Sequence, residues 1–370
     1  KLEKMPKNIQ SILTGLIEDL KSRESITGIG LFGSWSRGEA SSSSDIDLLV
    51  VDSRNLNYEY VERAEIEDIF IDLDYIPEKW VLRDFPSEID QKIYEAEILY
   101  DPNGTLERAK NTMLKIMWLP ERVEIRTGRY LIEADILLSR GLSAYGRDDY
   151  QSAKLSAVLG LERIMRIIME VNRIPFSNSR YIRALEASAK KVGLNELYGD
   201  YLEISGLSKV NRRASEGIFK ALIDMWEAVI RFVEVNSSTV KSLHEEIIKN
   251  LNFYCTRSFL HGIAARTRSL LQEGLPVEAV HYMLYTSASM LENYAWLLAK
   301  IEGTPFDYTR LMSYLKNSKT SPKIVYENAV EVLMLRDVSL QDAEETLQKT
   351  RDIALDIRKK RKELIASMLV

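Results

Sequence analysis

Four aspartates near the N-terminus stand in two Asp-x-Asp pairs, Asp45 with Asp47 and Asp72 with Asp74. Each pair lies in a run of branched and apolar residues that predicts a β-strand, so both carboxylates of a pair project to one face. Like charges this close repel each other on a half-buried sheet unless a cation neutralises them. Magnesium held by carboxylates and substrate phosphates meets that requirement in phosphoryl and nucleotidyl transfer. The pairs therefore predict a metal-dependent catalytic site.

The third carboxylate of that site is expected from the second pair. Asp72 is our first choice because it lies deeper in its predicted strand. Asp74 is nearer the strand end and is expected to be structural or solvent-facing instead. A charged edge strand is the alternative explanation for either pair alone. The predicted catalytic and metal-binding residues are Asp45, Asp47 and Asp72.

A glycine-serine turn precedes the first pair. Gly33 has no Cβ, so its backbone can approach a phosphate closely, and Ser34 can add a hydroxyl and an amide where a helix begins. Such turns are common in ordinary loops, and this one gains weight from the carboxylates that follow it. We expect Gly33 and Ser34 to bind nucleotide.

The segments around these side chains predict a small mixed α/β layer. Apolar spacing predicts a helix over residues 7–22, strands over 26–32, 45–51, 69–76 and 98–100, and a helix-like segment over 58–68. The turn at 101–104 predicts a domain boundary, because helical periodicity dominates from residue 105 onward. The expected fold class is α+β, with a small mixed-sheet domain over residues 1–104 followed by a large all-α region.

The helical region contains an internal repeat at an offset of 130 residues. In this register Leu161-Glu162 aligns with Leu291-Glu292, and Pro175-Phe176 aligns with Pro305-Phe306. Several matches in one register favour a duplicated helical unit. We expect two bundles, over residues 105–236 and 237–370.

The repeated glutamates have two explanations. Glu162 and Glu292 are candidates for a base that acts on the acceptor. Ion pairs with Arg180 and Arg310, which recur in the same register, explain them more simply.

Composition narrows the class of protein. The 370 residues are 45% apolar and 28% charged, with a net charge of −5, as in an ordinary globular protein. The acidic balance favours a small or neutral acceptor, so nucleic acid is possible as a partner but not indicated. Cys255 is the single cysteine, which excludes an intrachain disulfide and favours a reducing cytoplasm. The sequence has no signal-peptide pattern and no apolar run that predicts a membrane span.

The run from Gly33-Ser34 to Asp45-Ile46-Asp47 resembles the signature of the DNA polymerase β-type nucleotidyltransferase superfamily, especially its minimal and kanamycin-nucleotidyltransferase-like branches. The resemblance implies that Gly33 and Ser34 hold the β- and γ-phosphates of a nucleoside triphosphate, with ATP the first candidate. It implies that Asp45 and Asp47 bind two magnesium ions, and that Asp72 binds metal and helps to deprotonate a hydroxyl acceptor. Arg37 lies within the motif, which implies that it binds nucleotide through a phosphate; a salt bridge to Glu39 or another acidic neighbour is an equally good explanation. The acceptor is then a small molecule, a protein or an RNA end, and pyrophosphate leaves.

The helical region loosely resembles HEPN domains, which often accompany minimal nucleotidyltransferases. Their ribonuclease motif separates an arginine from a histidine by a longer gap than the three residues between Arg257 and His261. We therefore expect no ribonuclease activity. The helical region is a candidate surface for a homodimer. The alternative function is a nucleotide-binding or antitoxin-like regulatory protein that keeps the fold without turnover.

Overall fold

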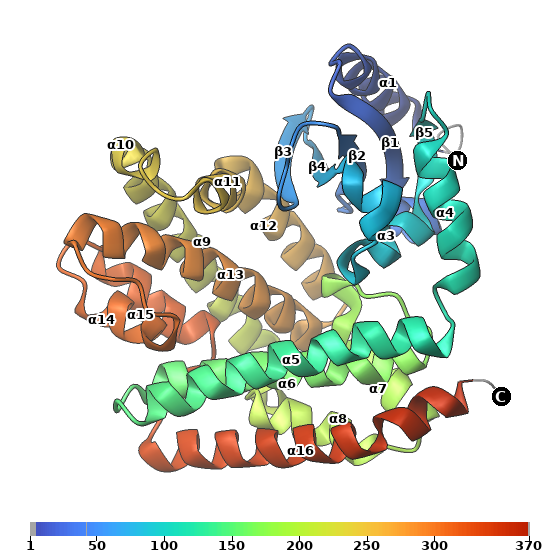
Figure 1. The fold of residues 1–370 in the computed structure, drawn as a ribbon. Helices are drawn as coiled ribbons and strands as arrows, with labels where there is room; N and C mark the ends of the chain where they lie inside the picture. The colour runs from blue at the N-terminus through green and yellow to red at the C-terminus, as the bar shows by residue number, and fades with distance from the viewer. Residues whose placement is uncertain (1–4, 42, 369–370) are drawn as a thin grey trace. The chain divides into compact units, whose positions relative to one another are not determined.

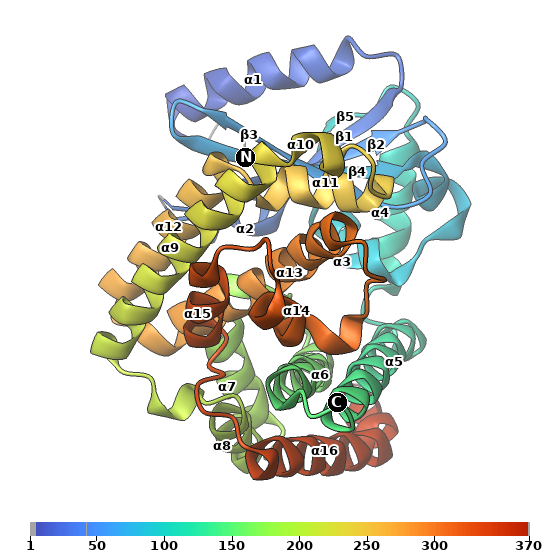
Figure 2. The ribbon, with the colours of Figure 1, turned by 90° about the vertical axis from the view of Figure 1, so that its left-hand side faces the viewer.

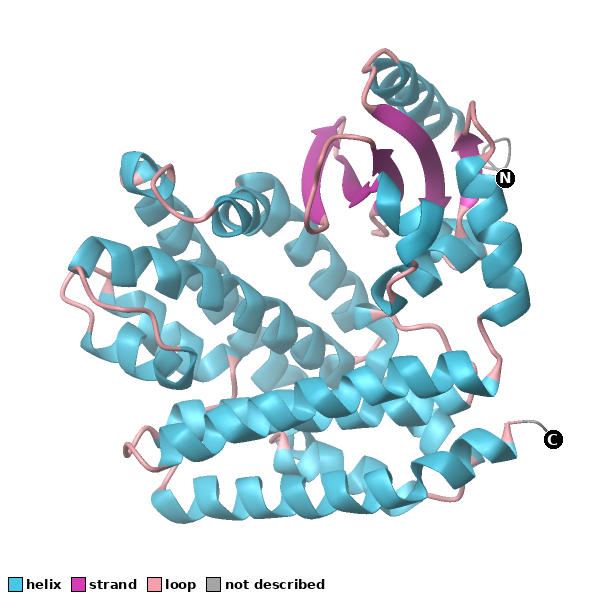
Figure 3. Ribbon diagram, in the orientation of Figure 1, coloured by secondary structure: helices cyan, strands magenta, loops and turns pink. Residues whose placement is uncertain are grey.

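The structure is a computed structural model that describes residues 5–41 and 43–368. Its contacts divide the chain into two compact units, Lys1–Arg122 and Val123–Val370. The strands all lie in the first unit, and the described part of the second unit is helical (Figure 3). This confirms the predicted α+β class. Within the described ranges, no helix combines the length and the apolar character that crossing a membrane requires.

The first unit is built on a five-stranded mixed sheet with the order β3-β4-β2-β1-β5 (Figure 1). β2 and β4 run parallel, and the other neighbouring strands are antiparallel. The strands are β1 (Ile26–Phe32), β2 (Ile46–Asp52), β3 (Tyr60–Ile66), β4 (Ile69–Pro77) and β5 (Glu97–Tyr100). The α-helices are α1 (Lys7–Lys21), α2 (Gly33–Arg37), α3 (Asp90–Glu95) and α4 (Thr105–Ile116).

Each face of the sheet buries its own apolar core. The apolar side of α1 packs on one face, together with inward-facing residues of β1, β2 and β4. On the other face, α3 and α4 cover Leu49 and Val51 of β2. Because side chains alternate along a strand, Asp47 projects to the same face as Leu49 and Val51. The side chain of Asp47 therefore lies on the same face of the sheet as α3 and α4.

The segment over residues 58–68 is a strand and a turn, so the helix expected there is wrong. β3 pairs antiparallel with β4, from Tyr60 opposite Tyr75 to Ile66 opposite Ile69. The hairpin closes through Glu67 and Asp68, whose φ angles of 51° and 63° are left-handed. Two-residue hairpin turns of the primed types require such angles. Pairing with β4 outweighs the local helical preference.

The helix α4 belongs to the first unit. Its apolar residues Leu106, Ala109 and Met113 lie in the core on the α3 face of the sheet. The first unit consequently extends to Arg122, beyond the turn at 101–104 where we placed the boundary. The turn separates the last strand from a helix that still needs the sheet to bury its apolar side.

The second unit repeats one series of helices at the predicted offset. The 3-10 turn η4 (Asn178–Arg180) recurs as η6 (Tyr308–Arg310), 130 residues later. The α-helices of the first series are α5 (Pro120–Tyr145), α6 (Tyr150–Val171), α7 (Tyr181–Lys191), α8 (Asn195–Ile204) and α9 (Arg212–Val235). The corresponding second series is α11 (Glu245–Tyr254) with α12 (Arg257–Gln272), α13 (Pro276–Glu302), α14 (Leu311–Asn317), α15 (Lys323–Val332) and α16 (Leu340–Ser367). The short helix α10 (Ser237–Val240) joins the two series.

The last helix of each series packs against the other series. The helix α9 contacts α12, α13 and α15, whereas α16 contacts α6 and α8. Figures 1 and 2 show α16 beside the first series. One continuous apolar core runs through both series. The two predicted bundles thus belong to one compact unit from Val123 onward, in which α9 and α16 each pack against the other series.

Trp226 on α9 tests this exchange. It is fully buried, stacks on Phe259 of α12 at 5.6 Å between ring centroids, and donates a hydrogen bond of 2.8 Å to the carbonyl of Tyr254. Trp226→Ala is expected to lower the free energy of unfolding by about 3–5 kcal/mol, measured by urea denaturation. Val235→Ala, at an 83% exposed position on the same helix, is the control that should change little. Equal stabilities of the two variants would contradict the exchanged packing.

Candidate functional site

The sheet register brings the predicted carboxylates to one place. Asp47 of β2 lies opposite Asp72 of the parallel strand β4 and opposite Phe32 of β1. Asp45 directly precedes β2. Loss of hydration raises the pKa of Asp47 well above its ordinary value, and the negative charges of Asp72 and Asp45 raise it further. A nearby cation would stabilise the charged form of such a carboxylate.

Gly33 directly follows β1 and begins α2, beside Asp47. Its φ of +73° is left-handed, and a Cβ added at this position would lie 2.2 Å from Oδ2 of Asp47. Any side chain here would therefore have to displace the carboxylate. Ser34 follows within the short helix α2. Gly33 and Asp47 are thus adjacent, and phosphate binding by Gly33 and Ser34 remains a prediction.

Arg37, the third candidate for nucleotide binding, is held by two carboxylates. Its Nε donates to Glu39 at 2.9 Å, as the alternative explanation predicted, and its Nη1 donates to Glu95 at 2.6 Å. The same Glu95 oxygen accepts a hydrogen bond of 3.1 Å from the amide of Gly33. Glu95 therefore ties Arg37 to the glycine turn. A phosphate contact of Arg37 remains a prediction.

Glu95 was not foreseen from the sequence. It ends α3, and its side chain is only 4% exposed. Burial raises the pKa of Glu95, and Arg37 and the Gly33 amide oppose that shift. No motif marks this glutamate, because only the fold carries it to the glycine turn.

A second unforeseen residue, Arg63 of β3, lies among the aspartates. Its Nε and Nη2 donate to the two oxygens of Asp72 at 2.7 and 2.8 Å. Its Nη2 also donates to Asp45 at 2.8 Å. Arg63 sits directly opposite Asp72 in the antiparallel pair of β3 and β4. The expected helix over 58–68 concealed this position, because no cross-strand partner can be assigned to a helical residue.

Asp74 takes part in a different cluster. It lies two residues further into β4 than Asp72, opposite Leu49, and is buried. Lys92 of α3 contacts it at 2.5 Å and also contacts Glu59 at 2.7 Å. Burial raises the pKa of Asp74 to about 6, although Lys92 opposes the shift. We expected Asp74 to be either structural or solvent-facing. The solvent-facing position is wrong, because Asp74 is buried, and the ion pair with Lys92 is consistent with a structural role.

The residue types at Asp45, Asp47 and Asp72 fit magnesium, which prefers carboxylate oxygens. One oxygen of Asp45 is buried and has no hydrogen-bond partner, so it has capacity for a cation. The described residues nevertheless contain no group of three or more carboxylate, imidazole or thiol side chains arranged to hold one metal ion. Arg63 explains this arrangement, because it draws Asp45 and Asp72 toward its guanidinium. The three carboxylates are thus of the right type to bind a metal, whereas the positions of Asp45 and Asp72 suit hydrogen bonds from Arg63.

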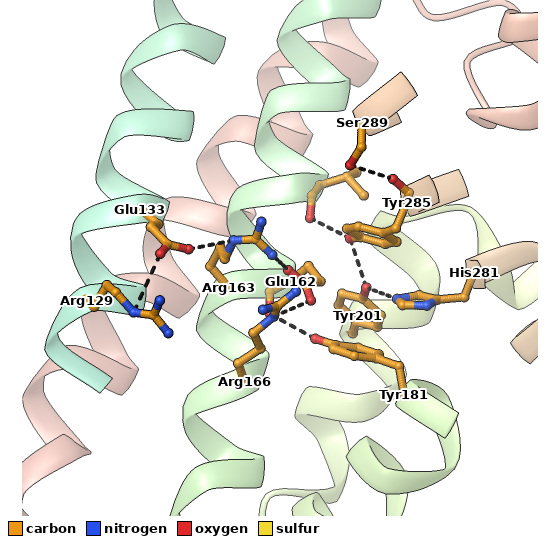
Figure 4. A network of polar contacts seen from close by, with 11 residues as sticks. Arg129, Glu133, Glu162, Arg163, Arg166, Tyr181, Tyr201, His281, Tyr285 and Ser289 are labelled. Atoms are coloured by element: carbon orange, nitrogen blue, oxygen red, sulfur yellow. Dashed lines mark hydrogen bonds and ion pairs between the residues drawn. The ribbon is translucent and has the colours of Figure 1, made fainter. Parts of the chain in front are cut away.

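In the helical unit, Glu162 belongs to a buried polar network (Figure 4). It is 1% exposed and pairs with Arg163 and, at 2.6 Å, with Arg166. In the same network, the hydroxyl of Tyr201 on α8 lies 2.9 Å from Nε2 of His281 on α13. Burial lowers the pKa of His281 to about 3, so the imidazole is neutral. The contact between Tyr201 and His281 joins the two repeats. Glu162 is buried in ion pairs, which is consistent with a structural role.

Comparisons with known proteins point to the same N-terminal residues. A family model described as a nucleotidyltransferase domain matches residues 13–123, less than half of the chain. Protein adenylyltransferase MntA from Thermococcus cleftensis is 50% identical over 42 residues, which are 11% of this chain and 42% of that protein. The chain therefore spans less than half the length of this curated relative.

A solved structure is also similar over most of its length. The crystal structure of a nucleotidyltransferase-like protein from Exiguobacterium sibiricum covers 88% of each chain, with 14% identity and a TM-score of 0.31. So distant a likeness supports no statement about function. The family model, described as a nucleotidyltransferase domain, matches instead the part of the chain, residues 13–123, that contains the glycine turn and the aspartates.

Proposed function

We propose that this domain transfers a nucleoside monophosphate, in the first instance AMP, from a nucleoside triphosphate to a hydroxyl acceptor. The observation that carries the proposal is the position of Asp47, which lies beside Gly33 and opposite Asp72. A phosphate held at the glycine turn is then next to the carboxylates that hold metal. The family match supports the reaction class, and the name of the adenylyltransferase relative supports ATP and a protein hydroxyl as the first pair to test.

In the proposed reaction, the acceptor oxygen attacks the α-phosphorus, and the bond from that phosphorus to pyrophosphate breaks. Gly33 and Ser34 bind the β- and γ-phosphates, and Asp45, Asp47 and Asp72 would hold the metals. Asp72 accepts the proton of the acceptor hydroxyl. When bound, two magnesium ions would lower the pKa of that hydroxyl and neutralise the charge on the departing pyrophosphate. A homodimer through the helical region and a cytoplasmic location remain predictions.

Calorimetry tests the metal-nucleotide site first. Each nucleoside triphosphate is titrated with magnesium into the wild-type chain and into an Asp45→Asn, Asp47→Asn double variant. We expect saturable binding that the double variant loses, followed by pyrophosphate release when an acceptor is supplied. Binding of no triphosphate, with magnesium or manganese, would exclude the enzyme. Binding without turnover on any acceptor class would favour the non-catalytic, regulatory alternative.

A pair of substitutions tests the third carboxylate. Asp72→Asn is expected to lower the rate of nucleotidyl transfer by about a hundredfold or more, because it removes a metal-binding charge. Asp74→Asn makes the same chemical change two residues away, beside Lys92. It is expected to retain most of the rate and to change mainly the thermal stability. The reverse result, with Asp74→Asn inactive and Asp72→Asn active, would exchange the two roles.

A further inference from the structure

Arg63 holds two of the three proposed metal ligands at the same time. Its guanidinium makes a two-pronged contact with Asp72, and Nη2 also reaches Asp45. The side chain is 5% exposed, and the ring of Phe70 lies 5.6 Å from the guanidinium carbon. Contacts on several sides hold the cation in one orientation. Such two-pronged pairing is the strong geometry for arginine and a carboxylate.

The contacts of Arg63 occupy three of the four carboxylate oxygens that Asp45 and Asp72 offer to a metal. Both oxygens of Asp72 and one oxygen of Asp45 accept hydrogen bonds from it. Arginine keeps its positive charge at every accessible pH, so it cannot yield the site by losing a proton. A divalent cation between the same carboxylates would repel the guanidinium at close range. Arg63 and the metal therefore exclude each other at Asp45 and Asp72.

We propose that Arg63 is an internal counter-ion that competes with divalent metal for Asp45 and Asp72. The inference rests on the proposed function, since it concerns the same metal site. In the nucleotide-free protein, Arg63 stabilises the carboxylates and keeps metal affinity low. A nucleotide adds negative phosphate charge at the adjacent glycine turn, which favours metal and offers the released guanidinium a new partner. Metal and nucleotide then bind together rather than one after the other.

Manganese binding without nucleotide tests the competition. Free Mn²⁺ is followed by electron paramagnetic resonance as metal is titrated into the wild type, Arg63→Gln and Arg54→Gln. Arg54 is the matched control, because it pairs with Asp52 at the other end of β2. We expect Arg63→Gln to bind Mn²⁺ about tenfold more tightly or better, through loss of a competing charge, and Arg54→Gln to match the wild type. In EDTA, Arg63→Gln should melt at a lower temperature than the wild type, and Mn²⁺ should restore it.

Mn²⁺ binding by Arg63→Gln that is no tighter than in the wild type would overturn the inference. If Arg63→Gln binds Mn²⁺ no more tightly than the wild type, Arg63 positions the carboxylates for metal instead of competing with it. If Arg63→Gln does not fold, Arg63→Lys applies the same test, because lysine cannot make the two-pronged contact and should also bind Mn²⁺ more tightly. A failure of the proposed function is distinguishable, since neither protein would then bind Mn²⁺ even with ATP present.

Discussion

Asp47→Asn is expected to abolish nucleotidyl transfer and to make the metal-free protein more stable. The activity falls by at least about a hundredfold, because the carboxylate that links the glycine turn to the metal site loses its charge. The stability rises because the wild-type carboxylate is poorly hydrated and lies near the charges of Asp45 and Asp72. Relief of that repulsion is on the order of 1 kcal/mol, or a few degrees in Tm. Pyrophosphate release and thermal melts in EDTA measure the two effects.

The control for this result is Asp52→Asn on the same strand. Asp52 is buried and pairs with Arg54, so the same change should lower stability and leave transfer unaffected. The gain from Asp47→Asn also depends on pH. Because the folded pKa of Asp47 lies above its ordinary value of 3.8, the folded state holds the proton more firmly. The difference in Tm should therefore shrink as the pH falls through the folded pKa. A stability loss at neutral pH would contradict this account.

Gly33→Ala is expected to remove nucleotide binding while the protein remains folded. The added Cβ would lie 2.2 Å from Oδ2 of Asp47, so the turn or the carboxylate must move. Either movement separates the phosphate-binding amide from the metal site. We expect transfer to fall by about a hundredfold, as for loss of one positioned group at a phosphate. Calorimetry with ATP and magnesium should show much weaker binding than for the wild type.

Gly38→Ala separates this effect from backbone strain. Gly38 has a φ of +75°, close to that of Gly33, but a Cβ there meets nothing within 4 Å. Both variants should lose about 1 kcal/mol of stability from the left-handed backbone, and only Gly33→Ala should lose binding. Equal losses of binding in the two variants would assign the effect to the conformation of the loop. An active Gly33→Ala would place the phosphates elsewhere.

The pair Asp45 and Asp47 could be assigned to one site from the sequence because strand alternation is a local property. The choice of Asp72 had a weaker basis, since its depth in the strand does not distinguish it from Asp74. The parallel register does distinguish them, because it sets Asp72 against Asp47 and Asp74 against Leu49. Register depends on which strands become neighbours, and the spacing of residues along one strand does not determine this.

Arg63 and Glu95 lay beyond sequence reasoning for related reasons. Arg63 reaches the aspartates only because β3 folds back on β4 through Glu67 and Asp68, two residues that seldom adopt positive φ. Glu95 reaches Gly33 from a helix 62 residues away in the chain. Arg63 brings a positive charge to the aspartates, and Glu95 brings a negative charge to Arg37. The sequence thus predicted the carboxylates and the glycine turn as a candidate site, whose catalytic roles remain predictions, but it did not predict the charged groups that contact them.

The exchange of α9 and α16 has a consequence for how the protein folds during its synthesis on the ribosome. The first helical series is complete in sequence once α9 has emerged, yet its own packing partner is α16, the last helix of the second series. Until then α6 exposes an apolar surface, and α9 has no second series to cover. Contacts between such distant segments slow folding and leave the nascent chain open to aggregation. The helical unit therefore reaches its native state only after α16 has emerged, as one cooperative structure rather than as two successive halves.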